Sequence, residues 1–150
     1  MKFASSRLAL PTLAWIALAP AALLATDLTW DAGGSSPASP TGGGGTWSST
    51  NLNWSNGSSD LGWTTATDNA LFTAGSGGTI TLGENITVND ITFGGSSAYN
   101  IGSGSFTLTV NCTITVNRSN TVSSAVAGTD LTKAGSSTLG LAHSNTYTGD

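Results

Sequence analysis

Short runs of alternating apolar and polar residues begin near Gly78 and continue toward the end of the chain. In 79–82, 86–88 and 91–93, every second residue is Ile, Leu, Val or Phe. Such alternation indicates half-buried strands, because successive side chains of a strand point to opposite faces. Gly, Asn, Asp and Ser separate the runs and are typical of tight turns. Further strands are predicted at 99–101, 106–110, 114–116 and 121–126, and from Thr138 onward.

The runs fall into groups of three, and the groups recur about every 20 residues, a spacing found in solenoid repeats. Two architectures fit this pattern. One is a parallel β-helix, in which each turn is a rung of three short strands. The other is a β-sandwich of paired hairpins, which has similar strand lengths. The Asn-Gly turns that mark hairpins occur once, at Asn56-Gly57. Periodicity alone leaves both architectures open.

The inward face of these strands is predicted to form the core. The outward face carries threonine, whose branched Cβ favours extended backbone. Strand parity also places Cys112 inward with Val110 and Ile114. The expected core residues are Ile80, Leu82, Ile86, Val88, Ile91, Phe93, Ile101, Phe106, Leu108, Val110, Ile114 and Val116.

Residues 26–77 differ in composition and form a predicted N-terminal cap. The segment 33–45 holds two prolines and six glycines, so we expect a loop there. Tryptophans recur in the block in short polar runs, and we interpret them as closing the first rung and shielding its core. Alternatively, Trp47, Trp54 and Trp63 lie exposed in a row and stack on sugar rings.

The N-terminal residues 1–25 have the pattern of a secretory signal peptide. Lys2 and Arg7 form a basic start, an apolar run follows, and the chain becomes polar after Ala25. We expect cleavage after Ala25, or alternatively after Ala22. An uncleaved membrane anchor is the rival interpretation, and the two prolines within the apolar run count against it.

The charge of the chain excludes several partners. The formal net charge is −4, and removal of Lys2 and Arg7 with the leader leaves two basic against eight acidic groups, a net charge of −6. A chain this acidic lacks the basic surface patch that binds nucleic acid or an anionic membrane. Cys112 is the single cysteine, so no internal disulfide can form.

The residue pattern indicates no enzyme and no cofactor. Glu84 and Asp90 lie at turns six residues apart, where capping of the turn is the expected role. His143 is the only histidine, so a histidine-based zinc site is excluded, and we expect it to be exposed. We therefore predict no catalytic, cofactor-binding or metal-binding residue.

Residues 131–150 carry the most specific motif of the chain. The segment resembles the autotransporter-associated β-strand repeat, also called the passenger-associated transport repeat, and departs from its pattern at Ser137 and His143. The Trp-rich block also resembles the opening of proteins that carry this repeat. The matching motif residues are Leu131, Thr132, Lys133, Gly135, Thr138, Leu139, Leu141, Asn145, Thr146, Tyr147, Thr148 and Gly149.

This resemblance implies an exported bacterial protein and favours the solenoid over the sandwich. We therefore expect an all-β, right-handed parallel β-helix over 78–150, behind the Trp-rich cap. The implied function is that of a non-catalytic, passenger-like surface or extracellular protein, either a fragment or a short relative of autotransporter-type proteins. The alternative is a carbohydrate-binding or degenerate polysaccharide-lyase-like module.

The C-terminal end carries a further expectation about partners. The sequence stops just after Gly149, so we expect the final rung to lack its third strand and to expose unpaired main-chain groups. An uncovered sheet edge pairs readily with another chain. We therefore expect self-association through the C-terminal rung, no membrane span in the mature chain, and a glycan as the other candidate partner.

Overall fold

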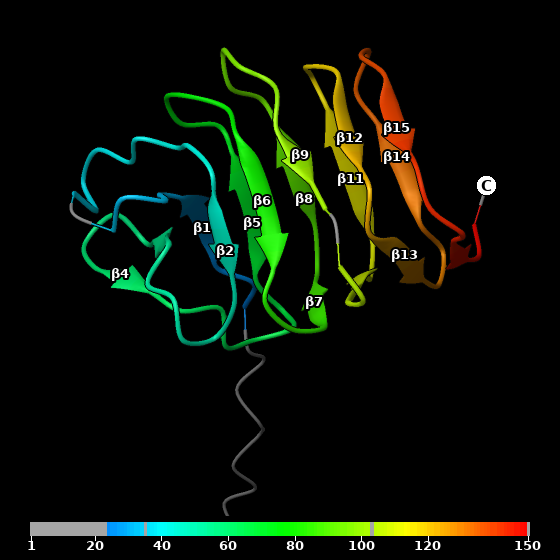
Figure 1. Cartoon of the computed structure of the whole chain (residues 1–150), viewed down its shortest axis with the longest axis horizontal. Coiled ribbons are helices and arrows are strands. Elements are labelled where there is room, and N and C mark those ends of the chain that lie inside the picture. The colour runs from blue at the N-terminus through cyan, green and yellow to red at the C-terminus, as the bar shows by residue number, and fades with distance from the viewer. Residues whose placement is uncertain (1–23, 35, 103, 150) are drawn as a thin grey trace, which may run out of the picture.

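The computed structural model describes residues 24–34, 36–102 and 104–149. Short strands from these residues stack side by side along the longest axis of the molecule, from the N-terminal strands to the C-terminal strands (Figure 1). The predicted signal peptide at 1–25 lies almost wholly outside the described residues. Within those residues, no helix has the length and apolar character needed to cross a membrane.

Each complete rung contributes one strand to each of three sheets. β1 (Asp27–Trp30) and β2 (Gly45–Trp47) form an incomplete first rung, and β3 (Trp54–Ser55) and β4 (Asp60–Leu61) lie in the excursion that follows it. The complete rungs of the described chain are β5 (Asn69–Phe72), β6 (Thr79–Leu82) and β7 (Ile86–Val88); β8 (Ile91–Phe93), β9 (Asn100–Ile101) and β10 (Thr107–Val110); β11 (Thr113–Val116), β12 (Asn120–Val122) and β13 (Ala125–Gly128); and β14 (Thr132–Ala134), β15 (Leu139–Leu141) and β16 (Thr146–Tyr147).

Strands of successive rungs pair in parallel, and this pairing defines the fold. The three stacks are β1-β5-β8-β11-β14, β2-β6-β9-β12-β15 and β7-β10-β13-β16. A hairpin sandwich would instead pair consecutive strands antiparallel. The predicted all-β parallel β-solenoid is therefore confirmed, and the β-sandwich is excluded.

The register stacks apolar side chains into ladders along the axis. Ile86 aligns with Leu108 and Leu108 with Val126, and all three are buried. The predicted core is confirmed at every position except Phe106, which is 38% exposed. Phe106 lies in the turn before β10, where the alternation of the strand does not yet apply.

The prediction that Cys112 faces inward is also wrong, because its side chain is exposed. Asn111 and Cys112 form the turn between β10 and β11. Parity holds along one extended strand, but the turn changes the chain direction between Val110 and Ile114. Counting across it therefore assigned the wrong face.

Two other strand assignments differ from expectation. The predicted strand 121–126 is divided into β12 and β13 by a turn at Ser123 and Ser124. The final rung contains a third strand, β16, which pairs with β13, so the expectation that it lacks one was wrong. Asn145-Thr146-Tyr147 has no apolar alternation from which this strand could be predicted.

Asparagine side chains join the rungs at their corners. Asn89 Nδ2 donates to Asn69 Oδ1 at 2.9 Å, and Asn69 Nδ2 donates to Asp27 Oδ1 at 2.8 Å. This chain of side-chain hydrogen bonds links three successive layers. Elsewhere Asn85 Oδ1 accepts the N–H of Thr107 at 2.9 Å. The amides thus satisfy polar groups where the strands end.

The excursion after β2 contacts the N-terminal strand of each of the three sheets. β3 pairs antiparallel with β1. Asn53 Nδ2 donates to the carbonyl oxygen of Thr46 in β2 at 2.9 Å, and Trp63 Nε1 donates to that of Thr87 in β7 at 2.9 Å. Because unpaired sheet edges invite association, these contacts protect this end of the solenoid.

Four tryptophans of the N-terminal block pack as one aromatic cluster beneath the excursion. The rings of Trp30 and Trp54 meet edge to face with centroids 5.0 Å apart, and those of Trp47 and Trp63 meet in the same way at 5.0 Å. Phe72 joins the cluster and stacks on Phe93 in the next rung. The cluster is therefore continuous with the apolar core.

The stack of parallel strands begins earlier than Gly78. β1, β2 and β5 lie within the segment 26–77, yet β1 pairs in parallel with β5, and β2 pairs in parallel with β6. Only the excursion between β2 and β5 is therefore an insertion. The rest of the predicted cap at 26–77 contributes strands to the solenoid itself.

The register predicts opposite outcomes for neighbouring substitutions in β10. Leu108 is fully buried, whereas Thr109 lies on the other face of the strand and is partly exposed. Leu108→Asp places a charge in the apolar core and should unfold a domain whose total stability is about 5–15 kcal/mol. Thr109→Asp should be tolerated. Thermal melts followed by circular dichroism measure both, and similar losses of melting temperature would contradict the register.

Candidate functional site

The repeat motif at 131–150 folds as one turn of the solenoid. It supplies β14, β15 and β16 in order. The N–H of Leu131 donates to the carbonyl oxygen of Thr148 at 2.9 Å, so the end of the motif returns to a position beside its start. Thr148 and Gly149 thus follow β16 and lie beside Leu131.

Two residues of the motif have clear structural roles. Gly135 has a φ of +78°, and an added Cβ would lie 2.4 Å from the carbonyl oxygen of Val116 in the preceding rung. The turn after β14 therefore needs glycine. Asn145 Oδ1 accepts the N–H of Val126 at 2.8 Å, which joins the last two rungs at another corner.

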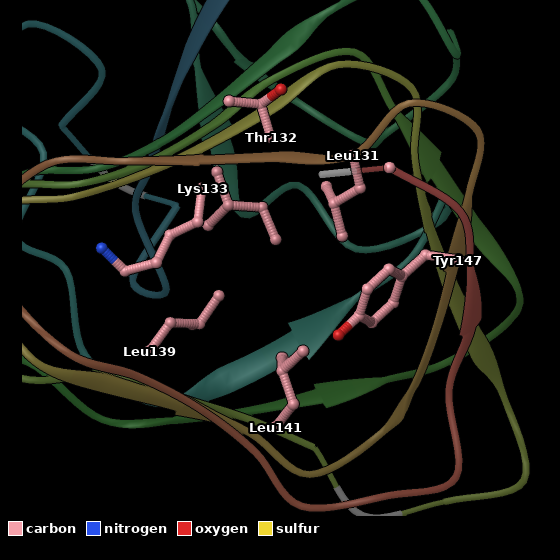
Figure 2. A pocket seen from close by; sticks show the side chains of 8 residues that line it. Leu131, Thr132, Lys133, Leu139, Leu141 and Tyr147 are labelled. Carbon is pink, nitrogen blue, oxygen red and sulfur yellow. The ribbon is translucent and has the colours of Figure 1, made fainter.

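The last rung surrounds an apolar hollow of about 280 Å³ at the C-terminal end of the solenoid. Side chains of Leu131, Leu139, Leu141 and Tyr147 converge on this space from the three sides of the rung, as Figure 2 shows. Ile114 of the preceding rung also lines it. Tyr147 remains 40% exposed, because no described residue covers it from the far side.

Lys133 aligns with core positions of the preceding rungs, although its own side chain is exposed. It aligns with Ile114 and Ile91, which are both fully buried, so the ladder of apolar residues ends in an ammonium group. In Figure 2 the Lys133 side chain points into the hollow, whereas Thr132 points away. Its Nζ donates to the carbonyl oxygens of Ala134 and Gly135 at 3.3 and 3.0 Å. An inward-facing charge of this kind discourages edge-to-edge pairing.

The tryptophans do not form the exposed row expected for sugar stacking. Trp47, Trp54 and Trp63 have relative exposures of 0%, 0% and 5%. A sugar ring needs an accessible aromatic face, and these faces contact other rings of the cluster. Their polar runs suggested exposure, but the cap folds back and buries them.

The acidic residues considered for catalysis serve the backbone. Glu84 Oε1 accepts the N–H of Ser49, and Asp90 Oδ1 accepts the N–H of Thr113 at 2.8 Å. His143 is exposed, and its Nδ1 lies 3.2 Å from the carbonyl oxygen of Ser144. Within the described part of the chain, no three His, Cys, Asp or Glu residues are placed to hold a metal ion.

Two pKa values depart from their ordinary range, and both belong to structural groups. Burial raises the pKa of Asp60 in the cap, and the carboxylate of Asp31 raises it further. Burial also raises the pKa of Tyr99, against a smaller opposing effect of a hydrogen bond with Gly43. The Tyr99 hydroxyl donates to the carbonyl oxygen of Ala74 at 2.9 Å, which anchors one rung to another.

Sequence reasoning missed the inward position of Lys133, although a signal was present. Leu131, Thr132 and Lys133 are consecutive, so alternation places Lys133 on the same face as Leu131.

The fold defines the chain as a parallel β-solenoid with a buried cluster of tryptophans at its N-terminal end. The chain is 39% identical over 134 residues to a protein described as "Adhesin BmaC autotransporter" from Brucella suis biovar 1 (strain 1330). The match covers 84% of this chain but 4% of the relative, so the chain spans a small part of that protein. It is thus distantly homologous to a region of an autotransporter adhesin.

No protein-family model matches the chain, and no solved structure matches it. The resemblance to the passenger-associated repeat family therefore rests on the residues of the motif itself.

Proposed function

We propose that this chain is an exported, non-catalytic β-solenoid of the bacterial cell surface, a passenger-like segment with an adhesin-like role. One observation carries the proposal. The motif at 131–150 folds as one rung of a parallel solenoid, in a chain that is homologous over most of its length to an autotransporter adhesin.

The side-chain chemistry supports binding rather than a reaction. The carboxylates of Glu84 and Asp90 are engaged with backbone N–H groups, and His143 lies on an exposed turn. A glycosidase needs two carboxyl groups that face each other across a sugar. A rigid solenoid instead presents long ordered faces, which suit the display of contact residues.

The first prediction concerns export. The leader should be removed when the full chain is expressed in a Gram-negative host, because a basic start and an apolar run precede a polar exit. N-terminal sequencing of extracytoplasmic material should begin at Thr26 or Leu23. Recovery of the intact chain from Met1 in a membrane fraction would refute cleavage.

The second prediction concerns adherence. Beads coated with residues 26–150 should adhere to cultured epithelial cells several-fold more than beads coated with the Leu108→Asp variant, because adherence requires the folded solenoid faces. The Thr109→Asp variant is the matched control and should adhere like the native chain. Equal adherence of native and Leu108→Asp beads in microscopy counts would sink the adhesin-like role.

We further propose that the 150-residue chain in isolation associates through its C-terminal rung. Strands β14, β15 and β16 are the edges of their three sheets, beside an apolar hollow. The excursion covers β1, β2 and β7 at the other end. A second copy that approaches with its own C-terminal rung therefore gives a pair.

The third prediction tests this pairing through Lys133. Native residues 26–150 should pair weakly, because two inward ammonium groups approach each other in such a dimer. Lys133→Leu should shift light scattering further toward dimer by removing that repulsion. Arg118→Leu removes the same charge away from the end and should change nothing. Monomers for both the native chain and Lys133→Leu, at tens of micromolar protein, would overturn the proposed pairing.

A further inference from the structure

A polar groove crosses the complete rungs on the outer side of the sheet β2-β6-β9-β12-β15. One hollow of about 490 Å³ extends from Gly78 to Gly140. A second hollow of about 450 Å³ shares Ala98 and Ser119 with the first and continues to Arg118. The two hollows thus form one surface, which runs along the side of the solenoid and reaches the last rung at Ser137, Thr138 and Gly140.

Hydroxyl and amide side chains line the groove in register. Thr79 aligns with Asn100 and Asn100 with Thr121, so the three lie on successive rungs about 4.7–4.9 Å apart. All three are exposed, as are Ser119 and Thr138, which form a neighbouring row two residues earlier on the same outer surface. Gly78, Ala98 and Gly140 lack bulky side chains, which leaves the space between the two rows open.

The backbone beneath the groove is already hydrogen-bonded. The N–H of Asn100 donates to Gly78 O at 3.0 Å, and the N–H of Asn120 donates to Thr138 O at 3.1 Å. The N–H of Tyr99 donates to Asn120 Oδ1. A peptide that binds by strand addition needs free main-chain groups, so recognition here falls to the side chains.

Arg118 gives the groove its charge. It is exposed, and among the described lining residues of both hollows none is acidic. Its planar guanidinium binds carboxylates through paired hydrogen bonds. The rest of the chain is acidic, with Lys133 at the open end as the other basic residue after the leader. The acidic chain repels a densely charged polyanion, so the ligand that suits the groove carries few carboxylates among many hydroxyls.

We infer that this groove binds an oligosaccharide that carries carboxylate groups. The threonine, serine and asparagine side chains hydrogen-bond the sugar hydroxyls across successive rungs, and Arg118 pairs with a carboxylate of the sugar. The inference rests on the proposed adhesin-like function and names the ligand class for it.

Binding at one groove is expected to be weak. Tyr99 is 2% exposed, so no aromatic face stacks on the sugar. Exposed polar side chains lose conformational freedom and bound water on association, which offsets much of the hydrogen bonding. If many copies are displayed on one surface, several grooves can bind one glycan-bearing surface at once, and this multivalency compensates for the weak affinity of a single groove.

The experiment is an NMR titration of the leader-free chain with tetragalacturonate, 3′-sialyllactose and neutral cellotetraose. Binding is detected by chemical-shift changes of the backbone amides. Shifts should map to the groove for an acidic sugar and weaken as salt increases. A response to one acidic probe alone identifies uronic or sialic acid as the source. No response to either, or an equal response to cellotetraose, would overturn the inference.

Two pairs of variants locate the site. Arg118→Gln should weaken binding about tenfold, whereas Lys133→Gln removes the same charge outside the groove and should not. Ala98→Gln should plug the groove and abolish binding, while Ala142→Gln, another exposed alanine outside the lining, should leave it unchanged. Unchanged melting temperatures confirm that each variant is folded. Retained binding by both groove variants contradicts the site.

The bead assay separates this inference from the proposed function. Adherence that survives Arg118→Gln and Ala98→Gln would leave the adhesin-like role standing and refute the groove as its contact surface.

Discussion

Main-chain hydrogen bonding between successive rungs is the interaction on which the structure depends. Every strand has two to four residues, too few to be stable alone. A strand of an inner rung persists because a parallel neighbour lies on each side and an apolar ladder fills the interior. The consequence is that stability is shared between neighbours, and the two ends of the stack are its weakest points.

The ends are treated differently. At the N-terminal end, the excursion folds back over the three sheets. It supplies β3 as a partner strand for β1, the Asn53 amide to β2 and the Trp63 indole to β7. Its rings fill the end of the core at the same time. At the other end, Lys133 places a charge where the ladder would continue, and its ammonium group bonds nearby carbonyls. The excursion adds a partner strand to the stack, whereas Lys133 puts a charge in register with the apolar ladder of Ile91 and Ile114.

The lateral faces carry the chemistry that suits an adhesin-like protein. Threonine, serine and asparagine repeat at the spacing of the rungs on the outer side of β6, β9 and β12, and Arg118 supplies a cation beside them. Since the rungs hold the backbone rigid, these side chains are presented in a fixed order. The tryptophans shield the core of the first rung, as interpreted from the sequence, and leave no aromatic face for a sugar.

The sequence by itself determined the strands, their inward faces and the turns, because alternation and glycine positions are local properties of the chain. Leu108 and Thr109 could be assigned to opposite faces without a structure. Assignments failed where a turn interrupted the count, as at Cys112 and Phe106, and where alternation was absent, as in β16. The burial of Trp63, the alignment of Lys133 with Ile114 and the groove beside Arg118 were decided by tertiary structure. Each depends on which residues of different rungs become neighbours, and that register arises only when the chain has coiled upon itself.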